Sequence, residues 1–249
     1  MNFFSLFKRK IIYNFKKKIL IDNDNFEDKS LDFLLNYYGS DKANIFKHTN
    51  ARGHGYSIFY NDKLKELKNK KIYILEIGSF SGASAAAFIK YFPNSKVFCF
   101  DVNISNFTYK SKDIHVYGLN INNKKKVVKK INKIFKENKF EKFDLIIDDG
   151  SHYLSDILFS VSTFFKYLKE KGLFIIEDFK HPNYYNYNRD VDDILIDDLL
   201  DKLKKKILFK SSIIDAESQK YLIETISQID SYKGNLADSD ICFIKKKID

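Results

Sequence analysis

The sequence is poor in cysteine and proline, contains no tryptophan and has no long hydrophobic run. Its two cysteines, Cys99 and Cys242, stand in apolar runs without zinc-type cysteine–histidine spacing. We therefore expect two reduced core thiols in a reducing, cytoplasmic setting rather than a disulfide framework. No stretch reaches the roughly 18 consecutive apolar residues of a membrane-spanning helix. Hydrophobic residues make up 44% and charged residues 31%, which favours a globular fold over disorder.

The formal net charge is +10, which raises the question of an anionic partner such as nucleic acid, a membrane or a nucleotide sugar. Lysine, asparagine, isoleucine and phenylalanine are all abundant, and the lysines are spread along the whole chain. A genome rich in A/T codons explains this composition, so the charge alone identifies no partner. We expect no nucleic-acid partner, because the sequence has neither an Asn/Asp-Pro-Pro-Tyr motif nor an added recognition module.

The first 20 residues contain no acid and six basic residues, and Phe4, Phe7, Ile11, Phe15 and Ile19 recur at helical intervals. The segment is too interrupted by charge to be a signal peptide. An amphipathic helix of this kind can lie on an anionic membrane surface. It can equally pack on its own domain or on a second subunit. We favour packing, with a homo-oligomer as the expected assembly.

Short apolar runs alternate with helical patterns after about residue 70. Expected strands cover 71–78, 96–102, 113–120, 143–150 and 173–179, with helices over 81–92, 123–139 and 152–172, the last closed by Gly172 as a C-cap. Two further strands, 221–232 and 239–247, flank a short turn around Gly234. The pattern predicts a doubly wound, Rossmann-like α/β fold with a mostly parallel seven-stranded sheet ending in an antiparallel hairpin. We assign 1–70 to an N-terminal helical segment and 71–249 to this domain.

The first candidate site is the strand-to-helix turn Glu76-Ile77-Gly78-Ser79-Phe80-Ser81-Gly82. Its glycines allow a ligand to approach the backbone, although such turns are common. Asp101 ends the next strand, where an acid can bind ribose hydroxyls; the alternative is a helix N-cap. The spacing Gly-x-x-x-Gly differs from the pyrophosphate-binding G-x-G-x-x-G pattern. The motif therefore favours a sulfonium nucleoside over a nicotinamide dinucleotide.

These residues, with the C-terminal hairpin, resemble the class I S-adenosylmethionine-dependent methyltransferases. The resemblance implies that the Gly78–Gly82 turn passes the methionine moiety and that Asp101 holds the ribose. It also implies that the segment around Leu119 borders the adenine. The cofactor-binding residues expected on this basis are Glu76, Gly78, Ser79, Gly82, Asp101, Val102, Leu119, Asn120, Asp148, Lys42 and Tyr56.

The second candidate site combines Asp148-Asp149-Gly150-Ser151-His152 after the fourth strand with Glu177-Asp178 after the fifth. Adjacent parallel strands bring their carboxyl ends to one edge of a sheet. Several carboxylates at one place repel one another unless a cation lies between them, and oxygen ligands suit Mg²⁺ or Mn²⁺. The alternatives are acids that cap helices and a structural histidine. Two acid clusters and a histidine together favour a metal site.

This motif resembles the metal-dependent sugar O-methyltransferases of macrolide biosynthesis and their relatives in bacterial polysaccharide clusters. The resemblance implies metal binding by Asp149, Glu177 and Asp178, with His152 as general base beside Asp149. It extends to Tyr38-Gly39-Ser40-Asp41-Lys42 and to His54-Gly55-Tyr56 with Tyr60, a signature that lies over the cofactor pocket in that family. Where the family often has Gly-Asp-Gln after the third strand, this chain has Gly118-Leu119-Asn120.

The segment 181–190 follows the fifth strand and is rich in tyrosine and asparagine, residues that suit sugar faces and hydroxyls. We interpret it as an acceptor lid, although an ordinary polar loop would look the same, and name Tyr60, His181, Tyr184 and Tyr185 as substrate contacts. The expected reaction is Mg²⁺-dependent methyl transfer to a sugar hydroxyl of a nucleotide-activated hexose or heptose, or of a surface-polysaccharide precursor. Open alternatives are a catechol-like acceptor, a nucleic acid and a non-catalytic binding role.

Overall fold

The computed structural model describes residues 3–248 of the chain. Its contacts divide the chain into two compact units, Met1–Asn120 with Gly234–Ala237, and Ile121–Lys233 with Asp238–Asp249. Seven strands follow the order β10-β11-β9-β8-β4-β5-β7, with the last three in the first unit. The boundary at residue 70 stays a prediction. Within the described residues, no helix has both the length and the apolar character needed to cross a membrane.

The first unit is organised around three parallel strands: β4 (Ile72–Ile77), β5 (Ser95–Asp101) and β7 (Ile114–Gly118). Every residue of β4 is buried, as expected of a parallel strand covered on both faces. Helix α4 (Ala83–Tyr91) connects β4 to β5 and is rich in alanine, so that it packs closely. The carboxyl ends of β5 and β7 lie side by side, because Asp101 pairs with Gly118.

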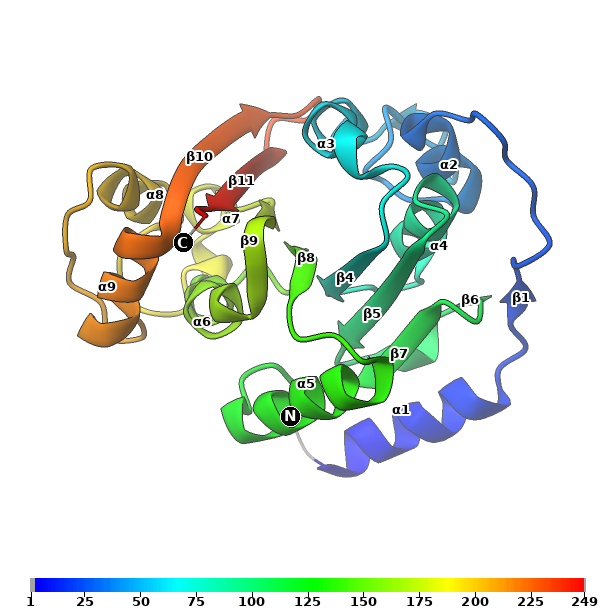
Figure 1. The fold of residues 1–249 in the computed structure, drawn as a ribbon, viewed down its shortest axis with the longest axis horizontal. Helices are drawn as coiled ribbons and strands as arrows, with labels where there is room; N and C mark the ends of the chain where they lie inside the picture. Colours follow the sequence, from blue (N-terminus) through cyan, green and yellow to red (C-terminus); the bar gives the residue numbers. More distant parts are fainter. Residues whose placement is uncertain (1–2, 249) are drawn as a thin grey trace. The chain divides into compact units, whose positions relative to one another are not determined.

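The N-terminal part of the first unit consists of short elements around these strands (Figure 1). Helix α2 (Leu31–Tyr38) begins at the N-cap Ser30, ends at Gly39 with φ 81°, and packs on α4. The remaining elements are α1 (Phe3–Phe15), β1 (Ile19–Leu20), β2 (Ile45–Phe46), β3 (Ala51–Arg52), α3 (Ser57–Leu64), the 3₁₀ helices η1 (Lys65–Leu67) and η2 (Ile104–Asn106), and β6 (Tyr109–Lys110).

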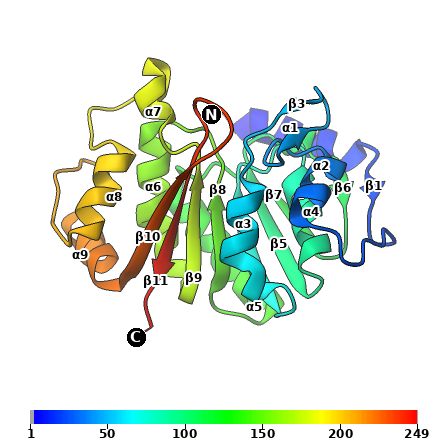
Figure 2. The same cartoon turned by 90° about the horizontal axis from the view of Figure 1, so that it is seen from above.

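The second unit contains the mixed part of the sheet. Strands β8 (Phe143–Asp148) and β9 (Leu168–Glu177) are parallel, whereas β11 (Asp240–Lys246) runs antiparallel to both β9 and β10 (Ile226–Lys233). Three helices, α6 (Leu154–Phe164), α8 (Ile196–Lys204) and α9 (Ala216–Thr225), pack together against these strands (Figures 1 and 2). The unit also has α5 (Lys124–Asn138), η3 (Phe165–Tyr167), α7 (His181–Tyr184) and η4 (Asn186–Asn188). The predicted sheet with its antiparallel hairpin is confirmed.

Two local predictions are wrong. Helix α6 ends at Phe164, and Gly172 lies inside β9 rather than at a C-cap. A Cβ at Gly172 would stand 2.9 Å from the Asp144 carbonyl oxygen, so the glycine permits a close approach of β9 to β8. The segment 221–225, predicted as strand, is the end of α9; that helix begins after the N-cap Asp215, which accepts a hydrogen bond from the Ser218 amide at 2.7 Å.

Candidate functional site

The turn between β4 and α4 has left-handed backbone at several positions. Gly78 has φ 83°, Gly82 has φ 79°, and even Phe80 has φ 41°. A Cβ at Gly82 would lie 2.3 Å from the ring of Phe107, so both the backbone angle and the space require glycine there. Ser79 is buried in the same turn. The turn therefore exposes backbone at the carboxyl end of β4, where α/β folds bind ligands.

Asp101 is brought to this turn from the neighbouring strand. One carboxylate oxygen accepts a hydrogen bond from the Phe80 amide at 2.8 Å, and the other accepts one from the Asn103 amide at 2.5 Å. Asp101 thus organises the turn and the start of the following loop, and it caps no α-helix. Val102 is 39% exposed beside it, and the buried Leu119 donates its amide to the Asp101 carbonyl at 3.0 Å, with Asn120 next in the chain.

The other predicted cofactor residues of the first unit are buried. Glu76 has no exposed surface and accepts a hydrogen bond from the Ser84 hydroxyl at 2.5 Å, which ties β4 to α4. Lys42 is 2% exposed and Tyr56 is fully buried. Tyr60, predicted to contact substrate, is also fully buried and packs on the ring of Phe88 at 5.6 Å between centroids. Nothing in this placement exposes Tyr60 to an acceptor.

The second unit brings acids and histidines from two strand ends together. Because β8 and β9 are parallel neighbours, Asp148 pairs with Ile176 and the loops that follow begin at the same edge. One ligand atom each of Asp149, His152 and Asp178 lies within 4.8 Å of the others. The Nε2 atom of His152 is 3.8 Å from Oδ1 of Asp149. Two carboxylates and an imidazole at this separation fit a divalent cation.

His181 adds a second imidazole to this cluster. Its Nε2 atom lies 3.8 Å from Oδ1 of Asp178 and 4.0 Å from Oδ2 of Asp238, and its ring centroid is 4.8 Å from that of His152. Glu177, the third predicted metal ligand, is 2% exposed and stands outside the converging group found among the described residues. Among the described residues, His152 rather than Glu177 is thus the third group that converges with Asp149 and Asp178.

The backbone at this cluster is unusual, since His152 has φ 57° and Asp178 has φ 51°. Left-handed conformations of this kind cost about 1–3 kcal/mol each in non-glycine residues and are concentrated at functional sites. Asp148 lies next to the cluster, 4% exposed, and its Oδ2 atom is buried without a hydrogen-bond partner. Burial raises the pKa of Asp148 to about 7, with the neighbouring Asp149 adding to the effect and hydrogen bonding opposing it.

Hydrogen bonds join the segment after β9 to Asp238, in the loop before β11, and to Asp240, the first residue of β11. Tyr184 donates to Asp240 at 2.7 Å, and Tyr185 donates to Asp238 at 2.6 Å, which raises the pKa of Tyr185. Motif reading missed Asp238 and Asp240, because they follow the segment by more than 50 residues and belong to no recognisable pattern. Their one signal in the sequence is a pair of acids at the start of the last strand.

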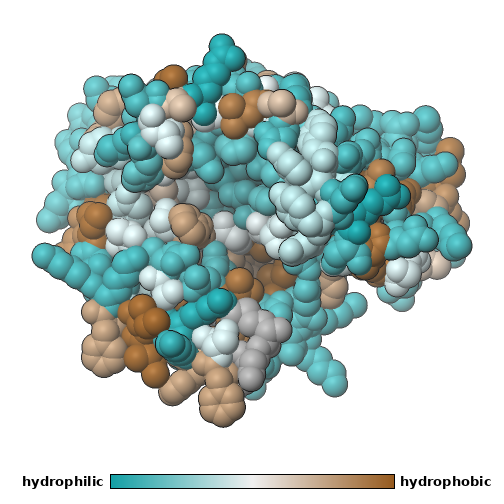
Figure 3. Space-filling model, turned by 180° about the vertical axis from the view of Figure 1, so that it is seen from behind, coloured by the Kyte–Doolittle hydropathy of each residue, from teal (hydrophilic) through white to brown (hydrophobic). Residues whose placement is uncertain are grey.

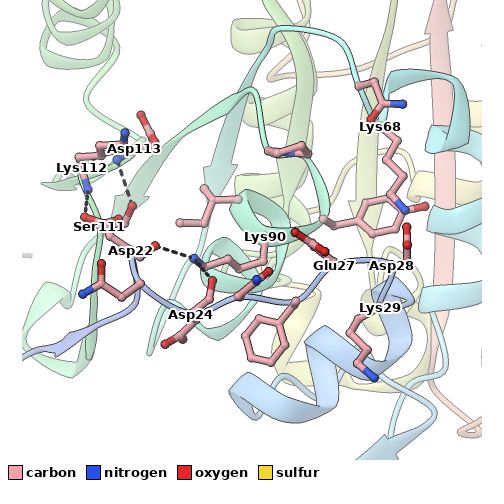
Figure 4. A pocket seen from close by; sticks show the side chains of 17 residues that line it. Asp22, Asp24, Glu27, Asp28, Lys29, Lys68, Lys90, Ser111, Lys112 and Asp113 are labelled. Carbon is pink, nitrogen blue, oxygen red and sulfur yellow. Dashed lines mark hydrogen bonds between the residues drawn. The ribbon is translucent and has the colours of Figure 1, made fainter.

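A pocket of about 680 Å³ in the first unit lies away from these motifs (Figure 4). It is lined by Asp22–Lys29, by Lys68 and Asn69 before β4, by Pro93 before β5 and by 111–113 before β7. Lys90 crosses it and donates to the Asp24 carbonyl at 2.8 Å. The pocket is therefore at the amino ends of the strands, whereas ligands of α/β sheets bind at the carboxyl ends.

Comparison with known proteins identifies the fold. The structure matches MycE methyltransferase from the mycinamycin biosynthetic pathway in complex with Mg, SAH and mycinamycin VI, with a TM-score of 0.67 and 19% identity over 89% of this chain and 55% of that one. A second crystal structure of MycE, with Mg and SAH, gives a TM-score of 0.65 at 19% identity, covering 88% of this chain and 55% of that one. The chain therefore has the fold of a class I methyltransferase.

Sequence similarity leads to proteins of the same kind, although no protein-family model matches the chain. L-olivosyl-oleandolide 3-O-methyltransferase of Streptomyces antibioticus is 29% identical over 162 residues, 61% of this chain and 38% of that protein. Mycinamicin VI 2''-O-methyltransferase of Micromonospora griseorubida is 23% identical over 132 residues, 50% of this chain and 31% of that protein. The chain thus spans less than two fifths of either curated relative. The resemblance predicted from the motifs is confirmed by these similarities.

Proposed function

We propose that the chain is an S-adenosylmethionine-dependent O-methyltransferase that uses a divalent cation, Mg²⁺ or Mn²⁺, to methylate a sugar hydroxyl. The observation that carries the proposal is the convergence of Asp149, His152 and Asp178 at the ends of two parallel strands. The fold supports the cofactor assignment, as do the two O-methyltransferases that are similar in sequence. S-adenosylmethionine supplies an electrophilic methyl group, and a divalent cation lowers the pKa of a bound hydroxyl.

In this proposal the first unit binds the nucleoside. The turn from Gly78 to Gly82 offers backbone amides and a surface without side chains to the amino-acid portion. Asp101, already held in place by the Phe80 amide, accepts hydrogen bonds from ribose hydroxyls with its remaining lone pairs. The apolar Leu119 and the half-exposed Val102 border the adenine.

The second unit prepares the acceptor. Asp149 and Asp178 would hold the cation, which would orient the acceptor hydroxyl and lower its pKa, and the imidazole of His152 would accept the hydroxyl proton. The carboxylate of Asp149, 3.8 Å from Nε2 of His152, stabilises the imidazolium that forms. The acceptor is a glycosylated small molecule or a nucleotide-activated sugar, and Tyr184 and Tyr185 at the edge of the cluster present rings to the sugar face.

The test begins with calorimetric titration of the EDTA-treated protein with S-adenosylhomocysteine, followed by methyl transfer assays with and without Mg²⁺. Acceptors should include nucleotide hexoses and heptoses, glycosylated macrolides and a catechol. We expect cofactor binding without metal and turnover only with metal. His152→Ala should lower turnover about 100-fold or more. His48→Ala, at an exposed histidine in the first unit, is the matched control and should keep activity.

Three results would contradict parts of the proposal. Absence of S-adenosylhomocysteine binding would refute the methyltransferase assignment. Turnover at the same rate with and without Mg²⁺ or Mn²⁺ would leave the cofactor assignment standing and refute the metal site. Faster turnover of the catechol than of any sugar would show that the acceptor is a phenol rather than a sugar. Asp149→Asn should greatly lower the Mg²⁺-dependent turnover and leave cofactor binding intact, with Asp201→Asn on the exposed side of α8 as its control.

A further inference from the structure

Helix α1 presents its apolar side to solvent. Its apolar face is defined by Phe7, Ile11, Ile12 and Phe15, which are 56%, 42%, 45% and 87% exposed, together with Phe4 at 76%. Residues 4, 7, 11 and 15 recur every three or four positions and so share one side of the helix. A helix on the surface of a globular domain normally buries this stripe. In α1 the stripe is turned outward.

The polar side of α1 is the side attached to the first unit. Arg9 donates to the Val102 carbonyl at 2.9 Å. Lys16, the residue directly after the helix, donates from Nζ to the Asn106 carbonyl at 2.8 Å and to the Ser105 carbonyl at 3.3 Å. Tyr13 adds an edge-to-face contact with Phe107. These bonds fix the orientation of the helix, because Arg9 and Lys16 cannot reach η2 and its flanks if the apolar face is turned inward.

The exposed apolar surface continues beyond the helix. Ile19 and Leu20 in β1 are 52% and 69% exposed. Figure 3 shows hydrophobic side chains gathered along α1 at the lower left of that view, bordered by hydrophilic ones. Apolar surface that is contiguous over one element and rimmed by charge is typical of an interaction site rather than of ordinary surface.

The charges around this face select the partner. Residues 1–20 contain six basic residues and no acid; the exposed Lys8 and Lys10 stand in α1 among the apolar residues, and the exposed Lys17 follows the end of the helix. A second copy of the chain packed on this face would bring these lysines against their own counterparts, with no acid on the helix to pair them. An anionic lipid surface offers an apolar layer and negative headgroups together, and long lysine side chains reach those headgroups.

We propose that the apolar face of α1 is a docking surface for an anionic phospholipid bilayer, on which the helix lies in the interface. Its 13 residues extend about 20 Å, too short to cross a bilayer but long enough to bury one side in the headgroup region. This proposal is independent of the methyl-transfer chemistry, since the exposed apolar side chains and lysines of residues 4–20 belong to neither candidate site.

Binding of the full chain to sucrose-loaded vesicles tests the proposal by co-sedimentation. Neutral phosphatidylcholine vesicles are compared with vesicles that contain about one third phosphatidylserine. We expect binding to the anionic vesicles only, weakened by salt. Phe7→Ser combined with Phe15→Ser should reduce the partition coefficient at least tenfold, because each phenylalanine loses most of its apolar burial. Lys10→Glu combined with Lys17→Glu should have a similar effect.

The matched control is Ile207→Ser combined with Leu208→Ser, two exposed apolar residues of the second unit, which should bind vesicles like the parent chain. All substituted side chains are exposed, so thermal midpoints should agree within error. Absence of anionic-vesicle binding would overturn the proposal, as would binding that survives the two phenylalanine substitutions. Sedimentation velocity without lipid tests whether the chain self-associates through this face. Self-association lost in Phe7→Ser/Phe15→Ser, without vesicle binding, would show that a second copy covers the face.

Discussion

Gly82→Ala is expected to destabilise the first unit strongly, through two effects at one atom. The left-handed backbone at φ 79° costs an alanine roughly 1–2 kcal/mol. The new Cβ would also meet the Phe107 ring at 2.3 Å, and displacing a packed aromatic side chain adds about 1–3 kcal/mol. Together the free energy of unfolding should fall by roughly 2–5 kcal/mol.

Urea unfolding followed by far-ultraviolet circular dichroism measures this change, with Gly118→Ala as the matched control. A Cβ at Gly118 would meet only the tip of the flexible Ile104 side chain, at 3.2 Å, and no left-handed angle is involved. That variant should stay within about 1 kcal/mol of the parent. Equal stabilities of the two variants would refute the reasoning, because the turn would then require neither the left-handed conformation nor the space beside Phe107.

Three further predictions use other parts of the chain. Burial raises the pKa of the Cys242 thiol to about 12 and that of Cys99 well above its usual value, so native protein should react with Ellman's reagent far more slowly than unfolded protein, which should titrate two thiols. Burial opposes ionisation of Asp193, but hydrogen bonds from Ser212 outweigh it and hold its pKa below the usual value. This stabilisation is full above the unfolded pKa and is lost as pH falls through the lower folded pKa, so Asp193→Ala should cost about 1 kcal/mol in urea unfolding at pH 7 and less at pH 3. Asn123→Ala removes the N-cap of α5 and should cost about 1 kcal/mol by the same measurement; an unchanged midpoint would show that the cap contributes nothing.

The strands of the sheet were predictable because their patterns are strong and local. The run before Gly78 is apolar at nearly every position, as burial on both faces requires, and the structure buries all six residues of β4. The hairpin at the end of the chain followed from two strand-like segments around a short loop. The prediction at Gly172 was wrong because a glycine after a helical pattern is typical of a C-cap. In the structure this glycine instead leaves room for the Asp144 carbonyl of the neighbouring strand. Only tertiary structure contains that information.

The candidate metal cluster was predictable in part, for a related physical reason. Parallel topology brings the ends of β8 and β9 together, so Asp149 and Asp178 were expected to converge, and they do. The left-handed angle at His152 and the participation of His181 depend on loop conformation, which short motifs do not encode. The roles assigned to the individual residues stay predictions until variants are measured.

Helix α1 shows why an amphipathic pattern does not by itself reveal which side of a helix meets the domain. Periodicity predicted the stripe, and packing on the domain or on a second subunit was the expected way to bury it. In the structure Arg9 and Lys16 join the opposite side to the first unit, and packing on a second subunit stays a prediction. Their acceptors include the Val102 carbonyl, directly after Asp101 in the candidate nucleoside site. Binding of S-adenosylhomocysteine that shifts this segment would also shift α1 and so change the affinity for vesicles. Thermodynamic linkage then requires that vesicles change the affinity for S-adenosylhomocysteine by the same factor. A factor that differs from one, and is the same in both titrations, would show that the lipid and the nucleoside sites are coupled, and factors of one would show that they are independent.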